Sequence, residues 1–105
     1  MLPLEKSSTL HDLQRYVLEM EAERGFSHRD VVQQCLLLGE EVGELFKAVR
    51  KHEKLRTGPT SIIGTVDEEL ADILIYVCSI ANRFDIKLED ALRHKEALNE
   101  TRTWI

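Results

Sequence analysis

The chain has 105 residues and a formal net charge of −5, and 43% of its residues are hydrophobic and 31% charged. This length suits one domain spanning residues 1–105, and the negative charge argues against a nucleic-acid polymer as partner, since such a partner requires a basic surface. No uncharged apolar run reaches the roughly 18 residues of a membrane span. Residues 1–10 lack the pattern of a signal peptide, so we expect a cytoplasmic protein.

The first half of the chain predicts two helices. After an N-terminal extension at residues 1–8, apolar residues recur at helical spacing until Gly25, which is a typical helix stop. Residues 27–30 (Ser-His-Arg-Asp) resemble a capping box that opens a second helix. The apolar stripe of this second helix contains Val31, Cys35, Leu38, Val42, Leu45 and Val49.

The second half of the chain predicts a loop and two more helices. Residues 54–64 contain glycines and a proline and predict the loop. Thr65 then opens a third helix, which is apolar on nearly all sides as far as Phe84. Such a helix needs neighbours all round, and a chain this short cannot supply them, so we expect a subunit interface. After a connection at residues 85–87, Leu88, Ala91, Leu92 and Leu98 mark the fourth helix.

We therefore expect an all-α fold, a four-helix bundle that dimerises through its apolar central helices. The two cysteines, Cys35 and Cys78, both fall on apolar stripes. Free cysteines behave as small core residues, and disulfides are rare in the cytosol. We expect both thiols to be free and buried.

Acidic residues form two motifs on the two most apolar helices. The first motif is Glu40-Glu41-Val42-Gly43-Glu44, and the second is Glu68-Glu69-Leu70-Ala71-Asp72. Acids three residues apart share a helix face, and unpaired carboxylates are costly to bury beside an apolar stripe. The helix dipole explains acids in a first turn, but the first motif lies in mid-helix. The two motifs together favour a divalent cation over a solvated surface.

The histidine and cysteine motifs that the sequence lacks narrow the choice of metal. None of the four histidines follows a glutamate at a distance of three residues, which disfavours a di-iron bundle. His-Glu-x-x-His and Cys-x-x-Cys are also absent, which disfavours zinc. Ligation by oxygen alone is typical of Mg²⁺, with Mn²⁺ as a substitute, and Mg²⁺ is the usual partner of phosphate substrates.

Further polar residues are candidates for substrate contacts. Lys95, Asn99 and Arg102 share one stripe of the fourth helix and would suit a polyphosphate with a base or sugar edge. A solvated basic face is the alternative interpretation of this stripe. Tyr76 follows Asp72 by one helical turn, so its hydroxyl could reach a ligand held at the acids. Otherwise Tyr76 is a core aromatic.

These residues resemble the MazG-like, all-α nucleoside triphosphate pyrophosphatase superfamily. The signature of that superfamily is Glu-Glu-x-x-Glu, a spacer of variable length, and Glu-x-x-Asp. Here it reads Glu40-Glu41-Val42-Gly43-Glu44, then a spacer of 24 residues, then Glu69-Leu70-Ala71-Asp72. With the downstream Lys95-x-x-x-Asn99-x-x-Arg102 pattern, the resemblance covers approximately residues 27–104.

The resemblance implies a homodimer or homotetramer that hydrolyses a nucleoside triphosphate to the monophosphate and pyrophosphate with Mg²⁺. Carried over to the matching positions, it implies metal ligation by Glu41, Glu44, Glu69 and Asp72. Glu40 would lie behind the ligands without binding the metal, or would activate the water. Tyr76, Lys95 and Asn99 would contact the nucleotide, and we add Arg102 from its place on the same stripe.

Two alternative functions remain open from the sequence. Phosphoribosyl-ATP pyrophosphohydrolase of histidine biosynthesis shares this fold and a similar layout of acids. A non-catalytic helical dimer that senses a nucleotide or binds a partner protein is the other alternative. Intact acids at all four ligand positions argue against a non-catalytic role, so we expect a house-cleaning nucleotide pyrophosphohydrolase. The sequence names neither the base nor the sugar of its substrate.

Overall fold

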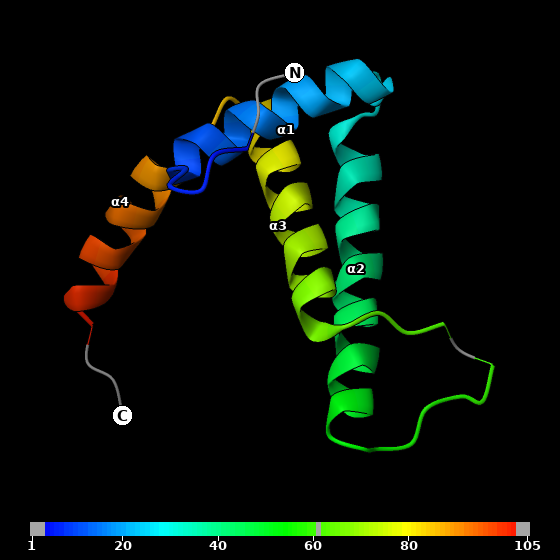
Figure 1. Cartoon of the computed structure of the whole chain (residues 1–105). Helices are drawn as coiled ribbons and strands as arrows, with labels where there is room; N and C mark the ends of the chain where they lie inside the picture. The colour runs from blue at the N-terminus through cyan, green and yellow to red at the C-terminus, as the bar shows by residue number, and fades with distance from the viewer. Residues whose placement is uncertain (1–3, 61, 103–105) are drawn as a thin grey trace.

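The computed structural model describes residues 4–60 and 62–102, which form four helices and no strand (Figure 1). The all-α prediction is confirmed, although the ends of the predicted domain, residues 1–3 and 103–105, lie outside the described residues. No helix in the described part of the chain is both long and apolar enough to cross a membrane. The helices are α1 (Leu10–Arg24), α2 (Val31–His52), α3 (Val66–Arg83) and α4 (Leu88–Glu100).

Local capping signals fix both ends of α1. The Thr9 hydroxyl accepts a hydrogen bond from the Asp12 backbone N–H at 3.1 Å, and the Asp12 carboxylate accepts one from the Thr9 N–H at 3.0 Å. This reciprocal pair satisfies two N–H groups that the first turn leaves free. At the other end, Gly25 has φ 77°, a left-handed conformation that glycine adopts without a steric penalty. The predicted stop at Gly25 is confirmed.

The predicted capping box of α2 was wrong in its position. The N-cap is Asp30, whose side chain accepts from the Gln33 N–H at 2.8 Å, while the Gln33 side chain accepts from the Asp30 N–H at 3.1 Å. Ser27 lies in the preceding turn and is too early to cap the helix. Thr65 caps α3 as predicted, through a bond from the Glu68 N–H at 3.4 Å.

Helices α2 and α3 run antiparallel side by side, α1 lies across one end of the pair, and α4 extends away from it (Figure 1). The core forms where α1 meets α3, around Val17, Met20 and Cys78. Gln14 of α1 ties this core to α4: its amide donates to the Ile86 carbonyl and accepts from the Leu88 N–H, both at 2.8 Å. Helix α4 therefore packs against α1 rather than completing a bundle around the α2–α3 pair.

The face of α2 that meets α3 is not the apolar stripe. Its buried residues are Gln34 and Ala48, and Glu41 lies midway between them at the same heptad position. Cys78 is buried as predicted, but the prediction that Cys35 is buried was wrong, because Cys35 lies on a side of α2 that none of the described residues covers. Large apolar residues are exposed on that side, including Leu36 at 67% and Phe46 at 62%.

Candidate metal centre

Three acids from two helices converge where the middle of α2 faces the first turns of α3. They are Glu41 of α2 and Glu69 and Asp72 of α3, and one carboxylate oxygen from each lies within 4.8 Å of the others. Glu69 is buried, with 8% of its surface exposed. The antiparallel pairing of α2 and α3 thus brings together three of the four predicted metal ligands.

The electrostatics of this three-acid group favour a bound cation. The pKa of Glu41 is raised from its ordinary 4.5 to about 7, first by burial and then by a hydrogen bond with Glu69 and the negative charges of Asp72, Glu69 and Glu44. Carboxylates this close cannot all ionise at low cost without positive charge among them. A donor set of carboxylate oxygens alone suits a hard divalent cation. The residues present therefore fit a metal ion.

Gly64 makes room for one of these carboxylates. It precedes the N-cap of α3, and a Cβ atom built at this position would collide with the Glu69 side-chain carboxylate. The sequence indicated Gly64 only as part of a loop. In the structure its missing side chain is part of the acid pocket.

The other two acids of the first motif lie outside the three-acid group. The Glu44 carboxylate is 3.6 Å from the Lys47 ammonium, although its charge still contributes to the raised pKa of Glu41. Glu40 is exposed. The predicted roles of Glu44 as a ligand and of Glu40 near the water therefore stay predictions.

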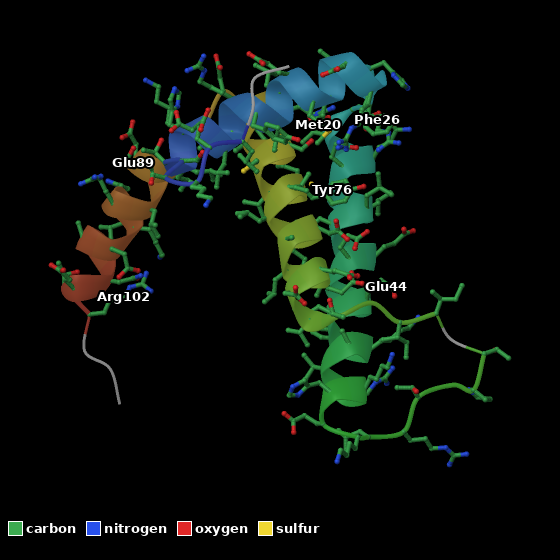
Figure 2. All side chains as sticks on the ribbon, in the orientation of Figure 1. Met20, Phe26, Glu44, Tyr76, Glu89 and Arg102 are labelled. Atoms are coloured by element: carbon green, nitrogen blue, oxygen red, sulfur yellow. The ribbon has the colours of Figure 1, made fainter. Side chains whose placement is uncertain are left out.

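A cavity of about 180 Å³ extends from the acids toward α1. Glu41 and Asp72 lie at one end of it, and Gln34 and Ser79 line it two helical turns further along. Tyr76 lines the cavity one turn after Asp72, as the sequence suggested. Figure 2 shows Tyr76 between Glu44 on one side and Met20 and Phe26, at the α1 end, on the other.

A buried polar network lies at the α1 end of this cavity, where Glu21 lines the wall. The Arg83 guanidinium donates to both oxygens of the Glu21 carboxylate, at 3.1 and 2.8 Å, and to the carbonyls of Phe26 and Arg29 at 3.1 and 2.8 Å. It thereby fixes the turn between α1 and α2. The sequence analysis missed this network, although a glutamate directly after Met20 on the buried face of α1 was an available signal.

The structure does not bring the predicted residues of α4 to the acids of the same chain. Lys95 and Arg102 are exposed, and the Asn99 amide donates to the Glu96 carboxylate at 3.0 Å. Figure 2 shows Arg102 at the far end of α4, on the opposite side of the molecule from Glu44. Of the four predicted substrate contacts, Tyr76 alone lies beside the three-acid group in this chain.

Comparison with known protein families assigns the chain to a class. Residues 26–102 match the MazG nucleotide pyrophosphohydrolase domain. The chain therefore belongs to the MazG family and is a nucleotide pyrophosphohydrolase. A search of the curated proteins finds no match.

Solved structures agree with this assignment. Two crystal structures of iMazG from Vibrio DAT 722 are each 33% identical to this chain, with TM-scores of 0.67 and 0.68. They cover 90% and 91% of this chain and 100% and 98% of their own. The Bacillus subtilis protein YPJD is 24% identical, with a TM-score of 0.79 over 94% of this chain and 100% of its own, which shows a shared fold.

Proposed function

We propose that this enzyme cleaves nucleoside triphosphates, ribo or deoxy, to the monophosphate and pyrophosphate, that it requires Mg²⁺, and that it cleans cytoplasmic nucleotide pools. The observation that carries the proposal is the three-acid group of Glu41, Glu69 and Asp72, whose oxygens lie within 4.8 Å of one another. A triphosphate carries several negatively charged oxygens, so the three carboxylates alone would repel it. The same acids attract it once they hold a divalent cation.

We propose that Glu44 completes the ligand set. It lies three residues after Glu41, so the two side chains share one face of α2. Its contact with Lys47 is an exposed pair, which is weak in water and easily exchanged for a cation. When bound, Mg²⁺ would neutralise the triphosphate and polarise the attacked phosphoryl group, and Mn²⁺ would be a substitute.

We assign Glu40 to the attacking water. Its carboxylate is adjacent to Glu41 in sequence, exposed, and outside the three-acid group. A carboxylate that does not bind metal remains able to accept a proton from water. Tyr76, which lines the cavity beside Asp72, would hold the sugar or the base.

Lys95, Asn99 and Arg102 would reach the nucleotide from a second copy of the chain. Within one chain α4 packs against α1 and leads away from the acids (Figure 1). A homodimer or homotetramer is supported by the exposed apolar side chains on the paired helices, because large exposed apolar patches mark interaction surfaces. These side chains are Val32, Leu36 and Phe46 of α2 and Leu70 and Leu74 of α3.

The test is to incubate the purified protein with Mg²⁺ and a panel of NTPs, dNTPs and phosphoribosyl-ATP and to measure pyrophosphate. We expect pyrophosphate from nucleoside triphosphates, and its loss in Glu41→Gln and Asp72→Asn. The exposed residues Glu5 and Asp90 provide matched controls, and Glu5→Gln and Asp90→Asn should retain activity. Orthophosphate as the product, or no turnover of any substrate by folded protein, would refute the proposal.

A further inference from the structure

A second cavity, the loop-end cavity, lies where α2 ends and α3 begins. Its volume is about 480 Å³, within the roughly 300–1,000 Å³ that is common for ligand pockets. Its walls come from the end of α2, with Ala48, Lys51 and His52, and from residues 64–67. None of these residues has a role in the function proposed above.

Helices α2 and α3 each lead from the acids into the loop-end cavity. On α2, Ala48 follows Glu41 by seven residues, so it lies on the same helix face, about 10 Å further along the axis at 1.5 Å per residue. Thr65, the N-cap of α3, precedes Asp72 by the same number of residues. Ala48 and Thr65 line the loop-end cavity, whereas Glu41 and Asp72 line the cavity on the α1 side. The acids therefore lie between two cavities along one pair of helices.

The acid group and the loop-end cavity meet at Gly64. This residue lines the cavity, and the Glu69 carboxylate lies where a Cβ atom of residue 64 would be. No side chain of residue 64 therefore separates the Glu69 carboxylate from the loop-end cavity. A phosphate chain bound at the acids can extend into this cavity.

The proposed place of the nucleoside sets the direction of the phosphate chain. Tyr76, which we propose holds the sugar or the base, lines the cavity on the α1 side of the acids. With the nucleoside there and the α-phosphate at the acids, the β- and γ-phosphates extend away from α1. The loop-end cavity lies on that side.

The end of α2 and the following loop residues supply positive charge on that side. The chain has a net charge of −5, yet residues 47–56 contain five lysines and arginines and one glutamate. Figure 2 shows several nitrogen-tipped side chains around the end of α2 and the start of the loop. Among the cavity residues, His52 lies 3.5 Å from Glu53, while Lys51 forms no ion pair with another described residue. Lys51 is therefore a cation available to a ligand in the loop-end cavity.

The position of Lys51 on α2 also favours contact with a ligand that begins at the acids. The Cα–Cβ bonds of a helix tilt toward its N-terminus, so the Lys51 side chain starts out in the direction of Glu41. Its long stem carries the ammonium group at a distance from the backbone, as a mobile point charge with three donors. Such a group suits phosphate oxygens that lie beyond the acids.

We propose that Lys51 contacts the β- and γ-phosphates of the substrate and makes the enzyme prefer triphosphates to diphosphates. The inference rests on the proposed function, in which the acids hold the substrate. In that reaction the water oxygen bonds to the α-phosphorus, and the water proton passes to Glu40. The bond from the α-phosphorus to the oxygen that bridges it to the β-phosphorus breaks, and this oxygen leaves with pyrophosphate and keeps the electron pair. Lys51 stabilises the negative charge that develops on the leaving pyrophosphate.

The first test measures the binding of pyrophosphate, which requires no knowledge of the base. Lys51→Met removes the charge and keeps most of the side-chain length, and it should weaken pyrophosphate binding in calorimetry with Mg²⁺ about tenfold. Arg50→Met is the matched control, since Arg50 is exposed and lies outside the cavity wall. It removes the same charge one residue away and should change the affinity less than about twofold in physiological salt. Equal weakening in both folded variants, or in neither, would overturn the proposal.

Asp67 allows a test with the opposite sign. It is an exposed acid on the wall of the loop-end cavity, so its charge opposes a bound anion. Asp67→Asn should tighten pyrophosphate binding about threefold, a modest effect because exposed charges are screened by salt. Weaker binding of pyrophosphate by folded Asp67→Asn protein would show that the cavity favours cations, and would overturn the proposal.

The third test measures the preference for phosphate-chain length. Each nucleoside triphosphate that the enzyme hydrolyses is compared with its diphosphate, which lacks the γ-phosphate. We expect the ratio of the two kcat/KM values to fall about tenfold in Lys51→Met, because the site loses a donor that only the longer chain fully engages. Arg50→Met should keep the wild-type ratio. An unchanged ratio in folded Lys51→Met protein would overturn the proposal.

The binding test separates this inference from the proposed hydrolysis. Weaker pyrophosphate binding in Lys51→Met than in Arg50→Met, in a protein whose wild type releases no pyrophosphate, would uphold the phosphate contact and refute the hydrolase. Pyrophosphate release by the wild type, with an affinity for pyrophosphate that Lys51→Met leaves unchanged, would refute the phosphate contact and leave the hydrolase standing.

Discussion

Two buried glutamates of this protein meet opposite electrostatic environments at the two ends of α3. Glu21 of α1 is neutralised by the Arg83 guanidinium, through two hydrogen bonds of 3.1 and 2.8 Å. Glu69 of α3 instead faces Glu41 and Asp72, and among the described residues no lysine or arginine forms an ion pair with any of these three acids. The chain is thus able to neutralise a buried acid and does not do so at the acid group.

This difference distinguishes a charged residue that stabilises the fold, Glu21, from one that serves a binding site, Glu69. A buried acid with its own arginine is complete within the chain and fixes the turn between α1 and α2. A buried acid among other acids has no such counter-charge among the described residues, which is the arrangement expected of a cation site. Substitutions at the two places should therefore have opposite effects on stability.

The largest expected effect comes from breaking the completed pair. Arg83→Met leaves Glu21 buried without a counter-charge and should lower the free energy of unfolding by about 3–5 kcal/mol, measured by urea denaturation. Arg93→Met is the control, since Arg93 forms an exposed pair with Glu89 at 2.8 Å, and should cost less than about 1 kcal/mol. Similar losses in both variants would contradict a structural role for the Glu21–Arg83 pair.

The next largest effect is expected from replacing each of the two glutamates by glutamine. The two substitutions should change the melting temperature in opposite directions. Glu69→Gln removes a negative charge from the acid group and should raise the melting temperature of the metal-free protein at pH 8. It should also lower pyrophosphate release at least about 100-fold, as metal-site changes commonly do. Glu21→Gln should lower the melting temperature, because it weakens the bond with Arg83. Destabilisation by Glu69→Gln in metal-free protein would show that the acid group needs no cation.

A smaller effect is expected at Gly64. Its backbone φ does not require glycine, so Gly64→Ala should change stability little, but the new methyl group displaces the Glu69 carboxylate. We expect a higher Mg²⁺ concentration for half-maximal activity, by about tenfold, in an assay of pyrophosphate release. Gly58→Ala, in the exposed loop, should leave the Mg²⁺ requirement unchanged.

Features that depend on neighbouring residues were predictable from the sequence. The cap at Thr65 and the stop at Gly25 are local, and the sequence placed them correctly. The acids were found because their spacing repeats with the helix, so pairing α2 with α3 brought Glu41 to Asp72.

Features that depend on distant contacts were not predictable in this way. Gln34 meets Ser79 across 45 residues of sequence, and one amide among polar residues gives no periodic signal. The direction of α4 depends on the bonds of Gln14 to the turn before that helix. The exposure of Cys35 depends on which side of α2 the other described residues leave uncovered.

The raised pKa of Glu41 predicts the direction in which the stability of the protein changes with pH. It rises from an ordinary 4.5, the value expected in the unfolded chain, to about 7 in the folded protein. The folded state therefore holds this proton more tightly than the unfolded state. The resulting stabilisation is complete below pH 4.5 and is lost as the pH rises through 7. A cation should restore stability above pH 7, where the carboxylates are ionised.

The most direct measurement is the melting temperature of the wild type and of Glu41→Gln at pH 5 and pH 8, each with and without Mg²⁺. We predict that the metal-free wild type loses stability relative to Glu41→Gln between pH 5 and pH 8. We also predict that Mg²⁺ restores it at pH 8, with little effect at pH 5 or on the variant. A melting temperature that responds to Mg²⁺ equally in both proteins, or in neither at pH 8, would contradict the assignment of these acids as a cation site.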